Sequence, residues 1–315
     1  MLPCLLLLAL LQHLQGSRQV PPPPVPPAPA GTVPAAPDPA PDPSIAALVP
    51  GAIPADARPE ARAAWERVAA GSLVPGTARA PIRAFVLALD VRYRKTPTQT
   101  NDLDAVYRFL GPDHLRISTE KRDLVSGPGG DWLVDRARGE QIRLDVGREY
   151  AEDRRQIEET RNVARNFVAL SDPRSLRLAS LETLAAPPAA LPEPLRARAA
   201  ELSWLRVRSP DFRPIEAGGS ARIHRASLGF DPHSGRVSIA LVEEDASRAA
   251  PSPSARVVEL RGSLEAQGYL VPRQILVYSI EPGSHPAAFS PAAGMDLYVK
   301  SADLAPALRP DEFAP

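Results

Sequence analysis

Between residues 85 and 94, apolar side chains recur at every second position, a spacing typical of a strand with one buried face. The apolar positions are Phe85, Leu87, Leu89, Val91 and Tyr93, and the alternate positions become charged at Asp90, Arg92 and Arg94. The pattern predicts a strand that packs one face on a core and turns the other to solvent.

The same spacing continues through the next segments. Leu103, Ala105, Tyr107 and Phe109 share one face, and Leu115 and Ile117 share a face after the turn Gly111-Pro112-Asp113. The glycine-rich stretch 126–130 predicts another break. Segments 132–136 and 142–146 are expected to form a hairpin around Arg138-Gly139.

Two segments have helical spacing instead. Residues 59–71 begin with Pro59, carry Ala61, Ala64, Trp65 and Val68 on one side, and end at Gly71. Residues 149–170 are mostly charged, with a narrow apolar stripe at Tyr150, Ile157, Val163, Ala164 and Phe167. The first pattern predicts a packed helix, and the second a helix that is only partly covered.

Strand patterns return in the second half, at residues 204–208, 223–230, 237–242, 257–261, 269–280 and 295–300. The loop 231–235 joins two of them, and Pro272 predicts a bulge or an edge position. The predicted order is a helix, about five strands, helices and about six strands. Tight turns favour antiparallel pairing, so the fold class is α+β and mainly β.

The first 58 residues lack these patterns. Residues 5–11 are an apolar run, far shorter than the roughly 20 residues that span a bilayer, and they predict a signal peptide over residues 1–19. An uncleaved anchor or a misassigned start codon is the alternative. Fifteen of the 38 prolines lie between Pro21 and Pro59, which predicts a disordered leader over residues 20–58. We expect one domain over residues 59–315, exported to the periplasm or cell envelope.

Composition excludes several classes of function. Thirty-seven basic and 37 acidic residues give a net charge of zero, which disfavours nucleic-acid binding. Cys4, the only cysteine, lies in the predicted signal peptide, so the mature chain would have no disulfide, thiolate metal site or cysteine nucleophile.

No motif of a nucleophile elbow, zinc protease, P-loop or dinucleotide site occurs. His224, Asp231 and His233 are the best metal candidates, but the hairpin loop explains Asp231 and His233 without a metal. For His114, a role in the turn is favoured over a role as a catalytic base. For Arg92 and Arg94, a solvated strand face is favoured over a site that binds an anionic head group. We therefore expect no enzyme activity, no metal and no cofactor.

The arrangement resembles the LolA-type family of periplasmic lipoprotein carriers. The resemblance rests on the strand 85–94, the pair 106–110 and 114–117 joined by Gly-Pro-Asp, the motif Gly130-Asp131-Trp132-Leu133, the late hairpin 260–277 and the terminal strand. It implies an unclosed antiparallel half-barrel of about eleven strands, with a helical lid over an apolar concave face that binds acyl chains.

The resemblance and the hydrophobic pattern predict the same binding site. The helix with the narrow apolar stripe covers the apolar sheet face only partly, and the uncovered part can bind an apolar ligand. Its expected lining is Leu87, Leu89, Val91, Tyr107, Phe109, Leu115, Ile117 and Trp132, and its expected lid residues are Ile157, Val163 and Phe167. The expected partner of this monomer is a lipid or lipoprotein. A sensor module that reads lipid or a membrane protein, and a hydrolase with an unfamiliar site, remain alternatives.

Overall fold

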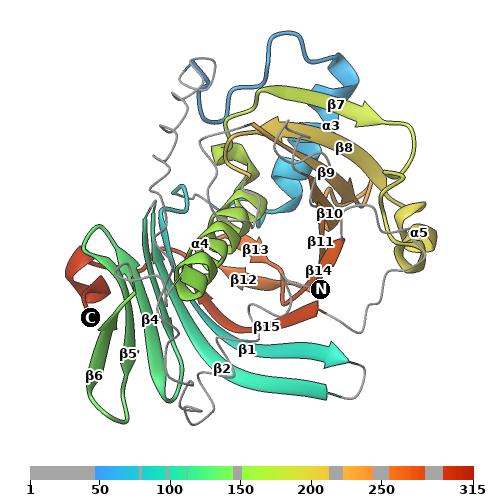
Figure 1. The fold of residues 1–315 in the computed structure, drawn as a ribbon. Helices are drawn as coiled ribbons and strands as arrows, with labels where there is room; N and C mark the ends of the chain where they lie inside the picture. The colour runs from blue at the N-terminus through green and yellow to red at the C-terminus, as the bar shows by residue number, and fades with distance from the viewer. Residues whose placement is uncertain are drawn as a thin grey trace, which may run out of the picture.

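One large antiparallel sheet organises the molecule in the computed structural model (Figure 1). The structure describes residues 47–77, 80–96, 99–111, 113–144, 151–212, 223–243, 255–280 and 294–315. Thirteen of the strands in these ranges form the sheet, which bends around the helix α4 without closing. The expected unclosed antiparallel half-barrel with helices is confirmed.

The first half of the chain contributes six strands, each paired with its neighbour in sequence. They are β1 (Ala84–Thr96), β2 (Gln99–Leu110), β3 (His114–Ser118), β4 (Arg122–Gly127), β5 (Gly130–Asp135) and β6 (Glu140–Arg143). The short turns between them explain this meander, because two-residue to five-residue connections join antiparallel neighbours.

The second half contributes the remaining strands. In the large sheet they are β7 (Ser180–Leu184), β8 (Ser203–Ser209), β9 (His224–Phe230), β10 (Val237–Glu243), β11 (Ala255–Arg261), β14 (Gln274–Ile280) and β15 (Gly294–Asp303). A separate two-stranded ribbon consists of β12 (Leu264–Ala266) and β13 (Tyr269–Val271).

The last strand joins the two halves. β15 lies between β1 and β14, so the order across the sheet is β6-β5-β4-β3-β2-β1-β15-β14-β11-β10-β9-β8-β7. Leu297 faces Val91 on one side and Ile275 on the other. The apolar face of the first half therefore continues without a break into the second half.

The structure contains more strands than the roughly eleven expected. The sequence pattern does not predict β4 or β7, because both strands are short and their apolar and polar residues alternate only weakly. β4 ends in the glycine-rich stretch, and β7 lies near the Ala/Pro-rich stretch. The segment expected as one strand over residues 269–280 is two, β13 and β14, with Pro272 between them. Proline cannot donate to a sheet ladder, so the strand ends there.

The helices lie on different sides of the sheet. α3 (Pro59–Gly71) has the bounds that its pattern predicts, and it buries Ala61, Ala64, Trp65 and Val68. α4 (Ala151–Ser171) crosses the concave side of the bent sheet (Figure 1). α5 (Glu193–Ala199) packs on the opposite, convex face, where Arg198 pairs with the buried Glu259.

Apolar side chains form two clusters on the concave face. One lies between β1–β3, β14, β15 and α4, and the other between β7–β10 and α3. Val258 on β11 packs against both. The concave face is therefore covered by two different helices, α3 over one half and α4 over the other.

The predicted signal peptide and most of the predicted leader, residues 1–46, lie outside the described residues. Residues 47–58, expected as the end of the leader, contact the domain. Gly51 donates its N–H to the Leu176 carbonyl at 2.9 Å, and the Arg62 guanidinium donates to the Pro54 carbonyl at 2.7 Å. Packed structure thus starts before Pro59. None of the described helices is long and apolar enough to cross a membrane.

Candidate ligand-binding site

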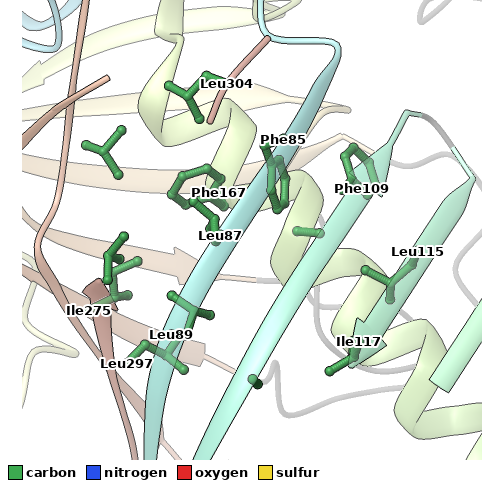
Figure 2. Close-up of a cluster of buried hydrophobic side chains, with 14 of the residues drawn as sticks. Phe85, Leu87, Leu89, Phe109, Leu115, Ile117, Phe167, Ile275, Leu297 and Leu304 are labelled. Atoms are coloured by element: carbon green, nitrogen blue, oxygen red, sulfur yellow. The ribbon is translucent and has the colours of Figure 1, made fainter. Parts of the chain in front are cut away.

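The concave face in front of α4 is built from cross-strand rows of apolar side chains. Phe85 faces Phe109, which faces Leu115, and Leu87 faces Tyr107, which faces Ile117. Residues that oppose one another in an antiparallel sheet point to the same side. The period-two pattern thus places these side chains on one surface, as Figure 2 shows for Phe85, Leu87, Leu89, Phe109, Leu115 and Ile117.

α4 covers this surface with its apolar stripe. Ile157 and Phe167 are 1% and 8% exposed, and both belong to the cluster of the sheet. The ring of Phe167 meets the ring of Phe85 edge to face, with centroids 5.0 Å apart and planes at 63° (Figure 2). The stripe that the sequence predicts therefore faces the concave side of the sheet.

An apolar cavity of about 70 Å³ remains between α4 and the sheet. It is lined by Phe85, Leu87, Leu89, Tyr107, Ala164, Asn166, Phe167, Leu170, Ser171, Val258, Leu260, Pro272, Ile275, Val277 and Leu297. None of these described lining residues is charged. Such a surface can bind apolar groups.

The predicted site residues take three different places. Leu87, Leu89, Tyr107 and Phe167 line the cavity. Val91, Phe109, Leu115, Ile117 and Ile157 belong to the same cluster but do not touch the cavity. The side chain of Val163 lies outside the described part of the structure. The predicted surface is thus one continuous cluster, and the cavity occupies only its end nearest Phe167.

The prediction for Trp132 is wrong. Trp132 opposes Val125, whereas its neighbour Leu133 opposes Leu124, which in turn opposes Ile117. Leu133 therefore lies on the concave face and Trp132 on the convex one, where Arg143 lies over its ring at 5.6 Å. Assigning Trp132 to the concave face is an error of one residue in the position of the strand. Because side chains alternate between the two faces, a one-residue shift moves every side chain to the opposite face.

The sequence did not predict the contribution of the second half. Val258 and Leu260 on β11, Ile275 and Val277 on β14, and Leu297 on β15 form the far wall of the cavity. Each pair on β11 and β14 has the period-two spacing of a buried face, so a signal was present. Only the insertion of β15 beside β1, which no local pattern shows, brings these residues to the site.

Polar contacts hold α4 along its edge. Arg161 donates to the Ser126 hydroxyl, and its Nη2 lies 3.4 Å from Asp131 Oδ1. Ser126 itself donates to Asp131, so the three side chains form one group. One turn further on, Arg165 Nη2 lies 3.2 Å from Asp113 Oδ1. These ion pairs join α4 to β4, to β5 and to the turn before β3.

A larger hollow of about 670 Å³ lies along β1, β2 and β15 and has charged walls. Arg92 Nε lies 2.9 Å from Asp102 Oδ1, and Lys300 pairs with Asp90 and with Asp104. The hydrogen bond that Arg92 donates to Asp102 contributes most to raising the pKa of Arg92, and the hydrogen bond that Lys300 donates to Asp90 contributes most to raising the pKa of Lys300. Arg92 therefore already has a carboxylate partner, as the solvated-face interpretation predicts. The side chain of Arg94 is outside the described residues.

The histidine candidates lie away from the cavity. Asp231 accepts the backbone N–H groups of His233 and Ser234 at 3.0 and 2.6 Å, and these bonds to the hairpin loop lower its pKa, those from Ser234 most. His114 packs on the ring of Phe313, with centroids 5.3 Å apart. Within the described ranges, no three His, Cys, Asp or Glu residues lie together as metal ligands would.

Comparisons with known proteins find similarity of structure only. No protein-family profile matches the sequence, and no curated protein matches it. A LolA superfamily protein from Nitrosomonas europaea aligns over 81% of this chain and 97% of its own, with a TM-score of 0.42 and 12% identity. An outer-membrane lipoprotein-sorting protein domain from Vibrio parahaemolyticus aligns over 80% and 95%, with a TM-score of 0.41 and 10% identity.

A DUF1329 family protein from Desulfovibrio piger aligns over 81% of this chain and 97% of its own, with a TM-score of 0.40 and 10% identity. The first of the three is the superfamily that the sequence resemblance names. The proposed function rests on this chain's own side chains.

Proposed function

We propose that this protein binds the acyl chain of a lipid or lipoprotein between its concave sheet face and α4, as a non-catalytic carrier. The observation that supports the proposal is the cavity, whose described lining comes from β1, β2, β11, β14, β15 and α4 and includes no charged group. An acyl chain is the ligand class whose binding free energy comes from apolar area, at about 25 cal/mol per Å².

Because the cavity is small, α4 must change position before a long ligand can bind. Small-molecule pockets usually enclose about 300–1,000 Å³, and this one encloses about 70 Å³. The side chains of α4, above all Phe167, occupy the space that a long acyl chain would need. Binding therefore requires α4 to move outward, and the ligand then takes the place of Phe167 against Phe85 and Leu87.

The character of α4 favours such a movement. Its stripe is narrow and its other faces are charged, so the helix loses little on becoming more exposed to water. The apolar surface of the ligand then packs against the sheet in the position that Phe167 leaves. The ion pairs of Arg161 and Arg165 lie at the edge, where water can replace them at low cost.

The cellular context belongs to the same proposal. A monomer that carries a lipid or lipoprotein in the periplasm or envelope agrees with the apolar run and proline-rich leader at the start of the sequence. A carrier also needs no catalytic group. His114 and His224 both lie outside the lining of the cavity.

The test is to identify what the protein carries. Protein purified natively from its own host, without detergent, is extracted with organic solvent, and the extract is analysed by mass spectrometry. We expect a stoichiometric acyl-containing compound, and saturable binding of a fluorescent fatty acid by the stripped protein. Wild-type protein with neither bound lipid nor saturable acyl binding overturns the proposal. Lipid binding that needs a co-purifying membrane protein supports the sensor alternative instead.

A further inference from the structure

A second hollow lies beside the C-terminal half of α4 and has a different chemistry. It encloses about 420 Å³ and is lined by Ile82, Arg83, Phe109, Gly111, Arg165, Val168, Ala169, Ser175, Leu176, Arg177 and Asp211. Its floor is apolar and its rim bears three arginines and one carboxylate. The volume is within the range of ligand pockets, unlike that of the cavity under α4.

Three arginines and one carboxylate line this hollow. Arg177 is paired with Asp211. The Arg177 Nε donates to Asp211 Oδ1 at 3.0 Å, and the Arg177 backbone N–H donates to Asp211 Oδ2 at 2.8 Å. Arg165 lies 3.2 Å from Asp113, a carboxylate that is 55% exposed. Arg83 is exposed, and among the described residues its guanidinium has no hydrogen-bond or ion-pair partner. The buried Asp172 beside the hollow accepts the Ile82 N–H at 3.4 Å and the Tyr269 hydroxyl at 3.3 Å. Of the three lining arginines, Arg83 is therefore the one whose guanidinium has no carboxylate partner among the described residues.

Three aromatic rings in contact run from this hollow to the apolar cavity. Phe109 lines the hollow, and its ring stacks on that of Phe85 with centroids 5.2 Å apart. Phe85 and Phe167 in turn line the cavity and contact each other. An outward movement of α4 takes Phe167 away from Phe85, and it would open the partition between the two spaces.

We infer that the arginine-rimmed hollow binds the anionic head group, a carboxylate or a phosphate, of an amphiphile whose acyl chain passes the three phenylalanines into the apolar cavity. The inference rests on the proposed function and adds the chemical class of the ligand. Guanidinium groups present paired donors that match both anions. Arg83 makes the direct contact, and Arg165 adds its positive charge from the moving helix.

The chemistry argues for an amphiphile over a small anion. A free anion would bind equally well to arginines on an open surface, and it would have no use for the apolar floor of Ile82, Val168 and Leu176. An amphiphile uses both the floor and the rim. A neutral amphiphile, conversely, would make no ion pair with Arg83.

The experiment compares two ligands that differ in the head group alone. Palmitate and monopalmitoylglycerol are each titrated into full-length protein by calorimetry, with wild type and the variant Arg83→Gln. We expect wild type to prefer palmitate by about tenfold, which corresponds to about 1.4 kcal/mol. Arg83→Gln should lose that preference and bind monopalmitoylglycerol as wild type does. Arg138→Gln, at the exposed turn between β5 and β6, makes the same change in net charge and should keep the preference.

The outcomes separate the two proposals. If neither amphiphile binds wild type, the proposed function itself fails. If both bind equally, or if Arg83→Gln keeps the preference, the acyl site stands and the head-group site is overturned. In a further arm, inorganic phosphate alone is titrated. Phosphate binding that matches palmitate in affinity and depends on Arg83 would mark a site for free anions, and would also overturn the inference.

Discussion

The ring of Phe167 on α4 meets the ring of Phe85 on β1 edge to face, with centroids 5.0 Å apart. Phe85 in turn stacks on Phe109. The helix is therefore seated on the sheet by an aromatic contact at the point where the apolar cavity begins. Because edge-to-face pairs are worth about 0.5–1.5 kcal/mol beyond their buried area, this contact contributes to the closed position without fixing it.

Truncation of Phe167 tests whether α4 is a lid. If it is, the displaced Phe167 packs over the bound acyl chain, so Phe167→Ala exposes that chain to water and we expect release of a fluorescent fatty acid to be about tenfold faster. The free energy of unfolding of the ligand-free protein should fall by less than the roughly 3–5 kcal/mol typical of Phe→Ala in a packed core. Stopped-flow release and urea unfolding measure the two quantities on one variant.

Phe212 provides the matched control, because it is fully buried in the cluster under α3 and does not line the cavity. Phe212→Ala should lower the unfolding free energy by the full core amount, with the release rate unchanged. If Phe167→Ala behaves as Phe212→Ala does, α4 is an ordinary core helix.

Arg161 is expected to slow the opening of α4. Its guanidinium bonds to Ser126 and lies 3.4 Å from Asp131, at a partly buried edge. Hydrogen bonds to charged groups contribute about 1.5–3 kcal/mol when protected from water, and less here. Arg161→Gln should therefore raise the rate of fatty-acid association several-fold, and high salt should raise the wild-type rate in the same direction.

Arg196→Gln is the control for this variant, since Arg196 forms an exposed ion pair with Glu193 on α5, far from the cavity. It should leave the association rate unchanged. Hydrogen exchange of the α4 amides, measured on both variants, should be faster only in Arg161→Gln. Unchanged exchange and association in Arg161→Gln would mean that this ion pair does not control opening.

Local patterns were sufficient for much of the fold. The alternation through Phe85, Leu87 and Leu89 predicted the face of β1, and Pro59 and Gly71 predicted both ends of α3. These features depend on short-range rules, the alternation of strand side chains and the preferences of helix ends. They hold here because tertiary contacts agree with them.

Other features depend on pairings between distant segments. No property of residues 294–303 shows that β15 inserts between β1 and β14, yet this pairing places Leu297 between Val91 and Ile275. Likewise the lining by Val258 and Leu260 follows from the closeness of β11 to α4, which only the bent sheet produces. Sequence reasoning therefore found one wall of the cavity and missed the opposite wall.

The reversed strand face at Trp132 gives a direct test of the site's orientation. Leu133 lies on the concave face and packs against the cluster of the cavity, whereas Trp132 lies on the convex face under Arg143. We expect Trp132→Gln to leave fatty-acid affinity within about twofold of the wild-type value. Leu133→Gln should weaken the affinity by more than about twofold, because the new side chain places a polar group on the apolar surface. Equilibrium fluorescence titration measures both. A larger loss of affinity in Trp132→Gln would contradict the register.

Ala164 offers a test in which the protein should gain stability as it loses function. Its methyl group on α4 points into the cavity of about 70 Å³, so the three extra carbons of Ala164→Leu have space to enter. Each buried methylene is worth about 0.8 kcal/mol, and some strain is expected, so the unfolding free energy of the ligand-free protein should rise by about 1 kcal/mol. Because the new side chain occupies the space of the acyl chain and favours the closed helix, fatty-acid affinity should fall at least about tenfold.

Calorimetric melting and binding titration check the two effects. Ala69→Leu is the control in the tightly packed α3, where overpacking should lower stability without a specific effect on binding. Tighter acyl binding by Ala164→Leu would place the ligand elsewhere on the molecule.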